Sequence, residues 1–199
     1  MAAINWGYAI NKPRVIDIDS NNLRKSDEIL REMPELQTCI GCGGCAAGNG
    51  CVFGGVVNEA IEKAKTADAF VFGTPVHYAS ASGNMTSFMD RLAYAGGKYL
   101  AYKPAAICAS ARRAGTTTTL DQLVKYPEFF HMPLVSGSYW PMVHGSKPEQ
   151  VLEDEEGCAV MRELGRNMAW LLKCIELGRE NGITHPENPL SLIHISEPT

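Results

Sequence analysis

Four of the seven cysteines lie close together in the sequence, in the pattern C-x2-C-x2-C-x5-C. The residues between them are mostly glycine and alanine, so the backbone can turn tightly and bring the thiols toward one centre. Thiolates are soft ligands, and the C-x2-C-x2-C run is the one that bacterial ferredoxins use for three ligands of a cubane cluster. The pattern predicts a [4Fe–4S] cluster; zinc is less favoured, and free thiols or redox pairs remain as alternatives. The predicted ligands are Cys39, Cys42, Cys45 and Cys51.

A second group of chemically capable residues follows the apolar run Ala69–Gly73. An uninterrupted apolar run of this length is typical of a strand that is covered on both faces. The segment after it is rich in hydroxyl groups and glycine and carries one aromatic ring, that of Tyr78. In open α/β sheets, ligands bind beyond the carboxyl ends of the strands. This loop therefore suits a flat, polar heterocycle such as a flavin, with the helix face at Met85–Tyr94 behind it.

A similar loop, with two arginines, follows the predicted strand 104–109. Predicted strands and helices alternate along the chain from Gly50 to Gly182. This alternation predicts a doubly wound parallel sheet with right-handed crossovers. The predicted helices are 56–67, 116–129 and 149–179, and a third strand is predicted over 132–140. Val15–Ile18 is a weaker strand candidate, because its polar alternation fits a buried central position poorly.

Composition narrows the classes of partner. The chain has 199 residues, 45% of them hydrophobic, and a net charge of −4. Mild acidity argues against nucleic acid or an anionic membrane as the main partner. No apolar run approaches the roughly 20 residues that span a bilayer, and the first residues do not resemble a secretory signal. A cytoplasmic location is expected, and clustered cysteines in such a chain favour a metal or redox site over disulfides.

Three motifs carry a resemblance to a known family: GTPVHYASASGNMTSFMDR, SARRAGTTTT and the helix DEEG…MRELGRNMAWLLKCIELG. They resemble the flavodoxin-like NADPH-dependent FMN reductase family over about residues 39–182. With the cysteine motif added, the chain is similar to the iron–sulfur flavoprotein branch of that family. The resemblance implies a flavodoxin-like fold, bound FMN and assembly as a homodimer or larger homo-oligomer. It also implies NAD(P)H as electron donor and a small-molecule or protein electron acceptor.

The resemblance also assigns roles to two loops. One loop wraps the flavin ring and ribityl chain, and its matching residues are Pro75, Val76, His77, Tyr78, Ser80, Ser82 and Gly83. The other loop lies along the opposite edge of the ring, and its matching residues are Ser110, Ala111, Arg112, Arg113 and Gly115. No side chain is assigned a role as catalytic acid or base.

The two ends of the chain depart from this family. The family begins with a strand and a phosphate-binding loop, whereas no such glycine-rich loop follows a leading strand here. The first 45 or so residues instead resemble cluster-binding proteins of the heterodisulfide-reductase C-subunit type, which suggests a chimera. Residues 190–199 resemble a translated sequencing adapter. The expected organisation is an atypical segment at 1–38, a cysteine loop at 39–54, an incomplete flavodoxin-like domain at 55–189 that lacks the first strand and phosphate loop, and a non-native tail.

The sequence thus predicts a flavin-dependent oxidoreductase that passes electrons between NAD(P)H, FMN and a [4Fe–4S] cluster. Weak or no retention of FMN is expected if the phosphate loop is missing. One alternative is an electron carrier without a small substrate of its own. The other is a non-enzymatic module that binds a cluster or zinc.

Overall fold

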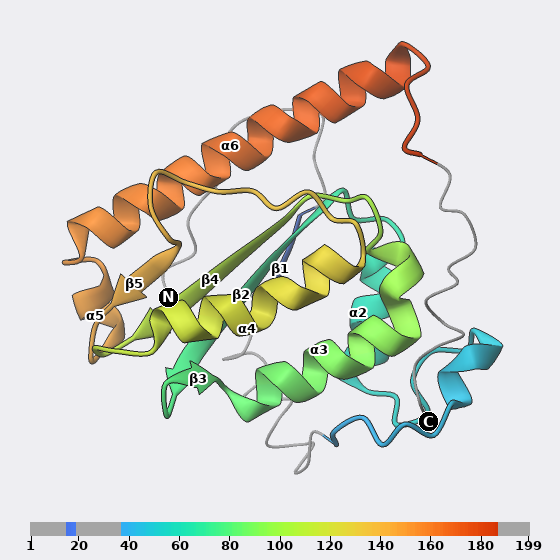
Figure 1. The fold of residues 1–199 in the computed structure, drawn as a ribbon, viewed down its shortest axis with the longest axis horizontal. Helices are drawn as coiled ribbons and strands as arrows, with labels where there is room; N and C mark the ends of the chain where they lie inside the picture. The colour runs from blue at the N-terminus through green and yellow to red at the C-terminus, as the bar shows by residue number, and fades with distance from the viewer. Residues whose placement is uncertain (1–14, 19–36, 187–199) are drawn as a thin grey trace.

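The computed structural model describes residues 15–18 and 37–186. Its sheet has the order β1-β2-β4-β5, all parallel, and a two-residue strand, β3, pairs antiparallel with β2 (Figure 1). The strands are β1 (Val15–Ile18), β2 (Ala69–His77), β3 (Ser80–Ala81), β4 (Ala105–Ala111) and β5 (Met142–His144). The helices are α2 (Val56–Ala64), α3 (Gly83–Gly96), α4 (Thr116–Phe129), α5 (Pro148–Val151) and α6 (Glu155–Glu180), with short 3-10 turns at Gly44–Ala47 and Gly97–Tyr99.

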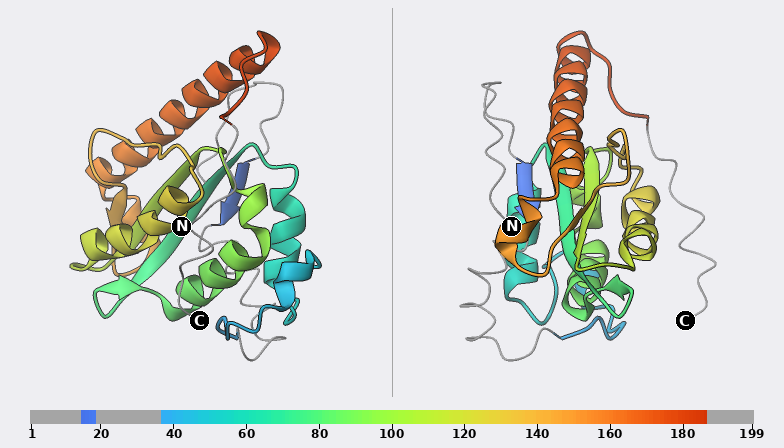
Figure 2. Two further views of the ribbon diagram at one scale, coloured as in Figure 1. Left: turned by 45° about the vertical axis from the view of Figure 1, so that its right-hand side comes forward. Right: turned by 90° about the vertical axis from the view of Figure 1, so that its left-hand side faces the viewer.

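Helices cover both faces of this sheet (Figure 2). Successive side chains of a strand point to opposite faces, and β2 follows this rule. Phe70 and Phe72 pack in one cluster with α2, α3 and α4, whereas Ala69 and Val71 pack in the other with α6. This three-layer arrangement confirms the predicted α/β fold class. None of the described helices combines the length and the apolar character needed to cross a bilayer.

The structure corrects the expectation that the sheet lacks its first strand. β1 pairs in parallel with β2, with Val15 opposite Ala69 and Ile18 opposite Phe72. In the flavodoxin order 2-1-3-4-5, the first strand lies next to the third in the same way. Without β1, one edge of β2 would present unpaired backbone groups, so pairing stabilises an extended segment even where the sequence signal is weak. Residues 19–36, where a phosphate-binding loop would follow β1, lie outside the described residues.

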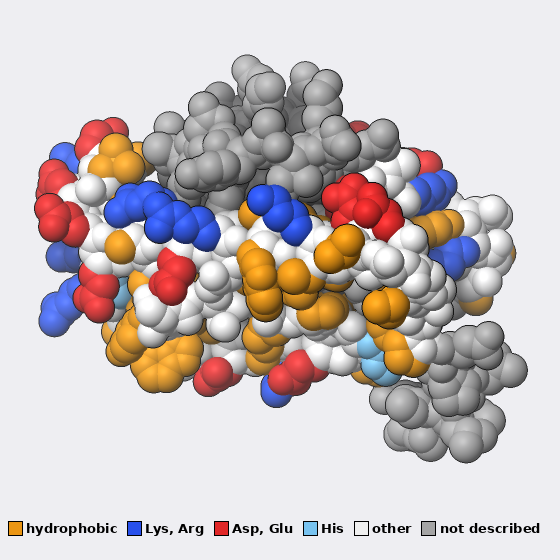
Figure 3. All heavy atoms as spheres, turned by 90° about the horizontal axis from the view of Figure 1, so that it is seen from above, with side chains coloured by type: hydrophobic (Ala, Val, Ile, Leu, Met, Phe, Trp, Pro, Cys, Tyr) orange, Lys and Arg blue, Asp and Glu red, His pale blue; other side chains and the backbone are white. Residues whose placement is uncertain are grey.

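The strand predicted over 132–140 is wrong. That stretch touches the sheet only at a single bridge, between Ala105 and Leu134, and the strand that pairs with β4 is Met142–His144. Between them the chain turns toward α6, where the Ser138 N–H donates to Glu163 (2.8 Å). The predicted helix 149–179 is in fact two helices, α5 and α6. The outer surface of the molecule on the side of α6 carries acidic, basic and hydrophobic side chains interspersed (Figure 3).

Asp154 is the N-cap residue of α6. Its carboxylate accepts hydrogen bonds from the Gly157 N–H (2.9 Å) and the His144 N–H (2.8 Å), so it caps the helix and ties it to β5. Burial by itself raises the pKa of this carboxyl, but the two backbone hydrogen bonds and the nearby His144 ring outweigh it. The net result is a pKa below the ordinary value of 3.8.

Replacement of Asp154 by alanine is expected to lower the free energy of unfolding at pH 7 by about 1 kcal/mol, the usual value of an N-cap. Because the folded-state pKa lies below the unfolded one, this stabilisation is present above the unfolded pKa. It is lost as the pH falls from about 5 through the folded value. Urea denaturation of the natural protein and of Asp154→Ala at pH 7 and pH 3 measures the difference in their free energies of unfolding. An equal difference at the two pH values would contradict the assignment.

Candidate functional site

The first predicted loop is a hairpin that extends the sheet. β2 continues past the predicted end at Gly73 to His77, and the chain returns through β3. Tyr78 and Ala79 form the turn, both with positive φ (50° and 61°), the combination that a two-residue hairpin of type I′ requires. His77 and Tyr78 are exposed, and the Tyr78 ring makes no aromatic contact within the described residues.

The hairpin and the loop after β4 meet at the carboxyl edge of the sheet. Pro75 of β2 is paired in register with Ser110 of β4. Gly115 has φ 96°, and a Cβ there would lie 2.4 Å from Ala79 Cα and 2.8 Å from Val76 Cγ1. Only glycine permits this close approach of the two backbones. The structure therefore brings together the two loops that the sequence separates by about 30 residues.

The two serines of the hairpin have internal partners. Ser82 is buried and caps α3, because its Oγ accepts from the Met85 N–H (3.3 Å). Its own N–H donates to the buried Thr74 Oγ1 (3.3 Å). Ser80 donates its hydroxyl to Gln122 of α4 (2.7 Å). These bonds fix the shape of the hairpin, while contacts of the predicted residues with a cofactor stay a prediction.

The loop after β4 presents free hydrogen-bond donors. Arg112 and Arg113 are exposed, and neither forms an ion pair with another described residue. In the described part of the chain, the backbone N–H groups of Arg112, Arg113 and Ala114 also have no acceptor. A row of unpaired N–H groups beside two guanidinium groups matches the carbonyl and nitrogen acceptors of a flavin or the oxygens of an anion. The donor set therefore fits the predicted cofactor.

Gln122 is a residue of this site that the sequence analysis missed. Its Oε1 accepts from the Ser80 hydroxyl and from the Ala81 N–H (3.2 Å), and so it holds the hairpin against α4. A glutamine on an exposed helix face gives no local signal of this contact, because its partners lie about 40 residues earlier in the chain.

Replacement of Gln122 by alanine is expected to lower the free energy of unfolding by about 1 kcal/mol, because two hydrogen bonds are lost. Faster backbone hydrogen exchange in residues 76–82 should accompany it. Gln122→Glu is the matched control, since it keeps an acceptor oxygen at the same place. Equal exchange rates in the alanine variant and the natural protein would contradict the role.

The cysteine loop lies beside α2 and α3. Cys39, Cys45 and Cys51 are half-buried and Cys42 is exposed, all with free thiols. Within residues 37–186, no three His, Cys, Asp or Glu side chains are arranged so that they could hold a metal ion. The structure thus places the four predicted ligands in one loop but does not bring their sulfurs together. Since metal–ligand bonds themselves order such loops, the ligand set stays a prediction.

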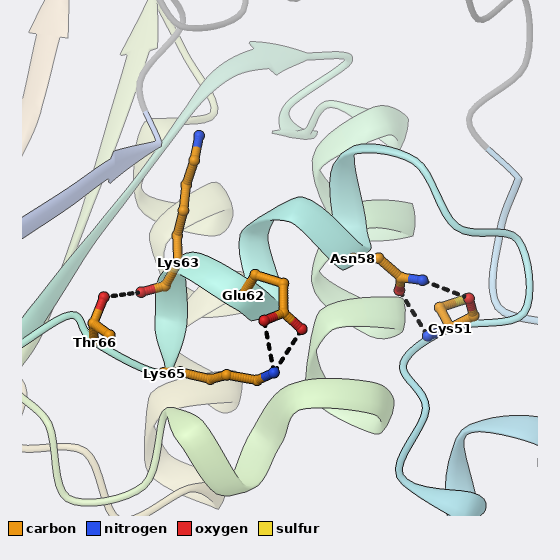
Figure 4. A network of polar contacts seen from close by, with 6 residues as sticks. All are labelled: Cys51, Asn58, Glu62, Lys63, Lys65 and Thr66. Atoms are coloured by element: carbon orange, nitrogen blue, oxygen red, sulfur yellow. Dashed lines mark hydrogen bonds and ion pairs between the residues drawn. The ribbon is translucent and has the colours of Figure 1, made fainter.

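The backbone of Cys51 is fixed by two hydrogen bonds to the side chain of Asn58. Its backbone N–H donates to Asn58 Oδ1 (2.7 Å), and Asn58 Nδ2 donates back to its carbonyl (3.0 Å; Figure 4). Asn58 belongs to the first turn of α2, so this clamp joins the end of the cysteine motif to the helix that precedes β2.

Three further cysteines lie outside the motif, at positions where the apolar pattern of the sequence predicts buried packing residues: Cys108, Cys158 and Cys174. Cys108 is buried in β4, which agrees with that expectation, and Cys158 is half-buried. Cys174 is exposed on α6, so its predicted burial is wrong. The apolar stripe of this helix turns away from position 174, because Met168 and Leu172 are the positions that face the sheet.

The parallel sheet, its helices on both faces and the paired loops at its carboxyl edge define a protein of the flavodoxin-like class. The chain belongs to the NADPH-dependent FMN reductase family, whose pattern matches residues 20–147. It is 30% identical over 151 residues to the iron-sulfur flavoprotein MJ1083 of Methanocaldococcus jannaschii, covering 71% of this chain and 78% of that protein.

A solved structure agrees with the fold. The apo form of an NADH:FMN oxidoreductase (EMOB) superposes with a TM-score of 0.51 at 16% identity, covering 82% of this chain and 90% of that one. This likeness concerns the fold alone. Together with the family match, it confirms the predicted flavodoxin-like architecture and the predicted family.

Proposed function

We propose that this protein is an NAD(P)H-dependent flavin oxidoreductase that holds FMN at the carboxyl edge of β2 and β4 and a [4Fe–4S] cluster in the cysteine loop. Membership of the FMN reductase family supports the flavin, and the name of the archaeal relative supports the cluster. The observation that carries the proposal is the close approach of Gly115 to Ala79, which joins the two loops into one wall. When bound, FMN supplies hydride and single-electron chemistry, and the cluster supplies single-electron chemistry.

The residues of this chain would bind and orient the flavin. The free N–H groups of Arg112, Arg113 and Ala114 would donate to its polar edge, and the two guanidinium groups would offset negative charge on the flavin or the nicotinamide nucleotide. Tyr78 offers an exposed ring for stacking. The rest of the wall would come from Pro75, Val76, His77, Ser80, Ser82, Gly83, Ser110, Ala111 and Gly115.

The four thiols of Cys39, Cys42, Cys45 and Cys51 would hold the cluster, because soft thiolates at this spacing are the ligands that such clusters take. The electron donor or acceptor other than NAD(P)H would be a small molecule or a protein. We also infer a cytoplasmic location and a homodimer or larger assembly. Sedimentation of the purified protein tests the assembly: a monomer at micromolar concentration would contradict it.

Anaerobic purification followed by visible spectroscopy tests the function. Flavin bands near roughly 370 and 450 nm are expected above the broad absorbance of a cluster. Addition of NADPH, and separately NADH, should bleach the flavin bands within the time of mixing. Iron and acid-labile sulfide should accompany the protein.

The other outcomes identify the alternatives. The second candidate is an electron carrier, since the relative's name pairs a flavin with an iron–sulfur centre and names no substrate. A protein that holds flavin and iron but is bleached only by a protein or chemical donor would be such a carrier. A colourless protein that holds zinc would overturn both flavin proposals in favour of a zinc-binding module.

A further inference from the structure

Arg91, in the middle of α3, is a buried cation whose side chain is engaged on all sides. The residue is 3% exposed, and its guanidinium carbon lies 5.4 Å from the centre of the Phe53 ring. Its nitrogens donate three hydrogen bonds, from Nε to Cys51 Sγ (3.2 Å), from Nη1 to the Gln37 carbonyl (3.3 Å) and from Nη2 to the Gly54 carbonyl (2.9 Å). Among the described residues, no carboxylate forms an ion pair with it.

A buried cation without a counter-charge is unfavourable, and among the described residues that accept a hydrogen bond from Arg91, Cys51 is the one whose side chain can carry a negative charge. The other two acceptors are neutral carbonyls. A metal-bound cysteine is a thiolate, so its negative charge would offset the charge of Arg91 directly. Hydrogen bonds donated to ligand sulfurs are also among the factors that set the reduction potential of iron–sulfur clusters.

The three contacts of Arg91 span the whole cysteine motif. The Gln37 carbonyl lies two residues before Cys39, and the Gly54 carbonyl lies three residues after Cys51. Asn58 separately fixes the backbone of Cys51 (Figure 4). The first and last ligands of the motif are therefore anchored to α2 and α3, whereas Cys42 is exposed at the middle of the loop.

We propose that Arg91 is a positioning residue for the cysteine loop: it closes the two ends of the loop on α3, orients the Cys51 sulfur and donates a hydrogen bond to that sulfur when the cluster is bound. This inference rests on the proposed function, because the cluster is its occupant. The anchoring itself is a property of the chain without metal, so the two can be tested apart.

The metal-free arm tests the anchoring by nuclear magnetic resonance on the full chain, with Arg91 unchanged and no metal bound. The Arg91 Nε–H is expected to exchange with solvent at least about tenfold more slowly than that of the exposed Arg112. Cys51→Ala should remove most of this protection, and Cys42→Ala should leave it. Equal exchange of Arg91 in the natural protein and in Cys51→Ala would overturn the contact with sulfur, whatever metal the protein binds.

The cluster arm compares Arg91→Gln and Arg91→Lys with the control Arg162→Gln, which removes a positive charge from an exposed position on α6. Arg91→Gln is expected to lower the iron content several-fold. The cluster that remains should have a reduction potential more negative by about 59 mV, which corresponds to a tenfold smaller equilibrium constant for its one-electron reduction. Arg91→Lys keeps the charge but not the three-nitrogen fork, so its potential should shift less while its iron content still falls.

The two arms distinguish failure of the cluster proposal from failure of the proposed role of Arg91. Natural protein without iron would overturn the cluster while the resonance experiment still decides the anchoring. Full iron content and an unchanged potential in folded Arg91→Gln would overturn the role of Arg91 and leave the cluster standing. If Arg91→Gln does not fold, which circular dichroism reports, the resonance arm decides because it leaves Arg91 in place.

Discussion

Replacing Cys42 with alanine is expected to remove nearly all of the iron and acid-labile sulfide from the protein, a loss of at least about tenfold. Cys42 is the central thiol of the C-x2-C-x2-C run, and a cubane cluster needs a thiolate at each iron. Because Cys42 is exposed and makes no hydrogen bond with another described residue, its loss should not unfold the chain. Iron and sulfide assays after anaerobic purification measure the effect.

Cys174→Ala is the matched control for this substitution, because Cys174 is also exposed but lies on α6, outside the motif. It should keep the full iron content. The flavin bands should survive in both variants, since the proposed flavin wall does not include the cysteine loop. A Cys42→Ala protein with undiminished iron would show that the ligand set is wrong.

Replacing Gly115 with alanine is expected to lower the free energy of unfolding by about 2–4 kcal/mol and to weaken flavin binding strongly. The backbone at φ 96° is strained for any residue with a side chain. The added Cβ would also lie 2.4 Å from the Ala79 backbone, which cannot move aside as a flexible side chain would. The two loops would therefore separate. Urea denaturation and a flavin titration measure the two effects.

Gly83→Ala is the control for the unfolding measurement, because Gly83 begins α3 at an ordinary φ with no atom within 4 Å of the added Cβ. Its unfolding free energy should change by less than about 1 kcal/mol. If Gly115→Ala were as stable as Gly83→Ala, the close approach of the two loops would not be a feature of the protein in solution.

The local sequence predicted the positions of α2, α3 and α4 and of the two central strands, although it joined α5 and α6 into one helix and ended β2 too early. Phe70 and Phe72 lie in an apolar run typical of a doubly covered strand, and the predicted helix from Thr116 to about Phe129 agrees with α4. The prediction of a strand over 132–140 is wrong because the apolar residues of that stretch precede a polar turn, and the strand begins only at Met142. Periodicity cannot place a three-residue strand such as β5, since its length is shorter than the pattern.

The sequence by itself determined the family and the candidate residues: the four cysteines at their spacing and the two polar loops. Only the tertiary structure decided which of these residues meet. It placed Gly115 against Ala79, set Gln122 under the hairpin and turned the Arg91 guanidinium toward Cys51. These contacts join residues between 36 and 42 positions apart, and they depend on the packing of helices on a sheet. The pattern of residues along the chain carries no record of such packing.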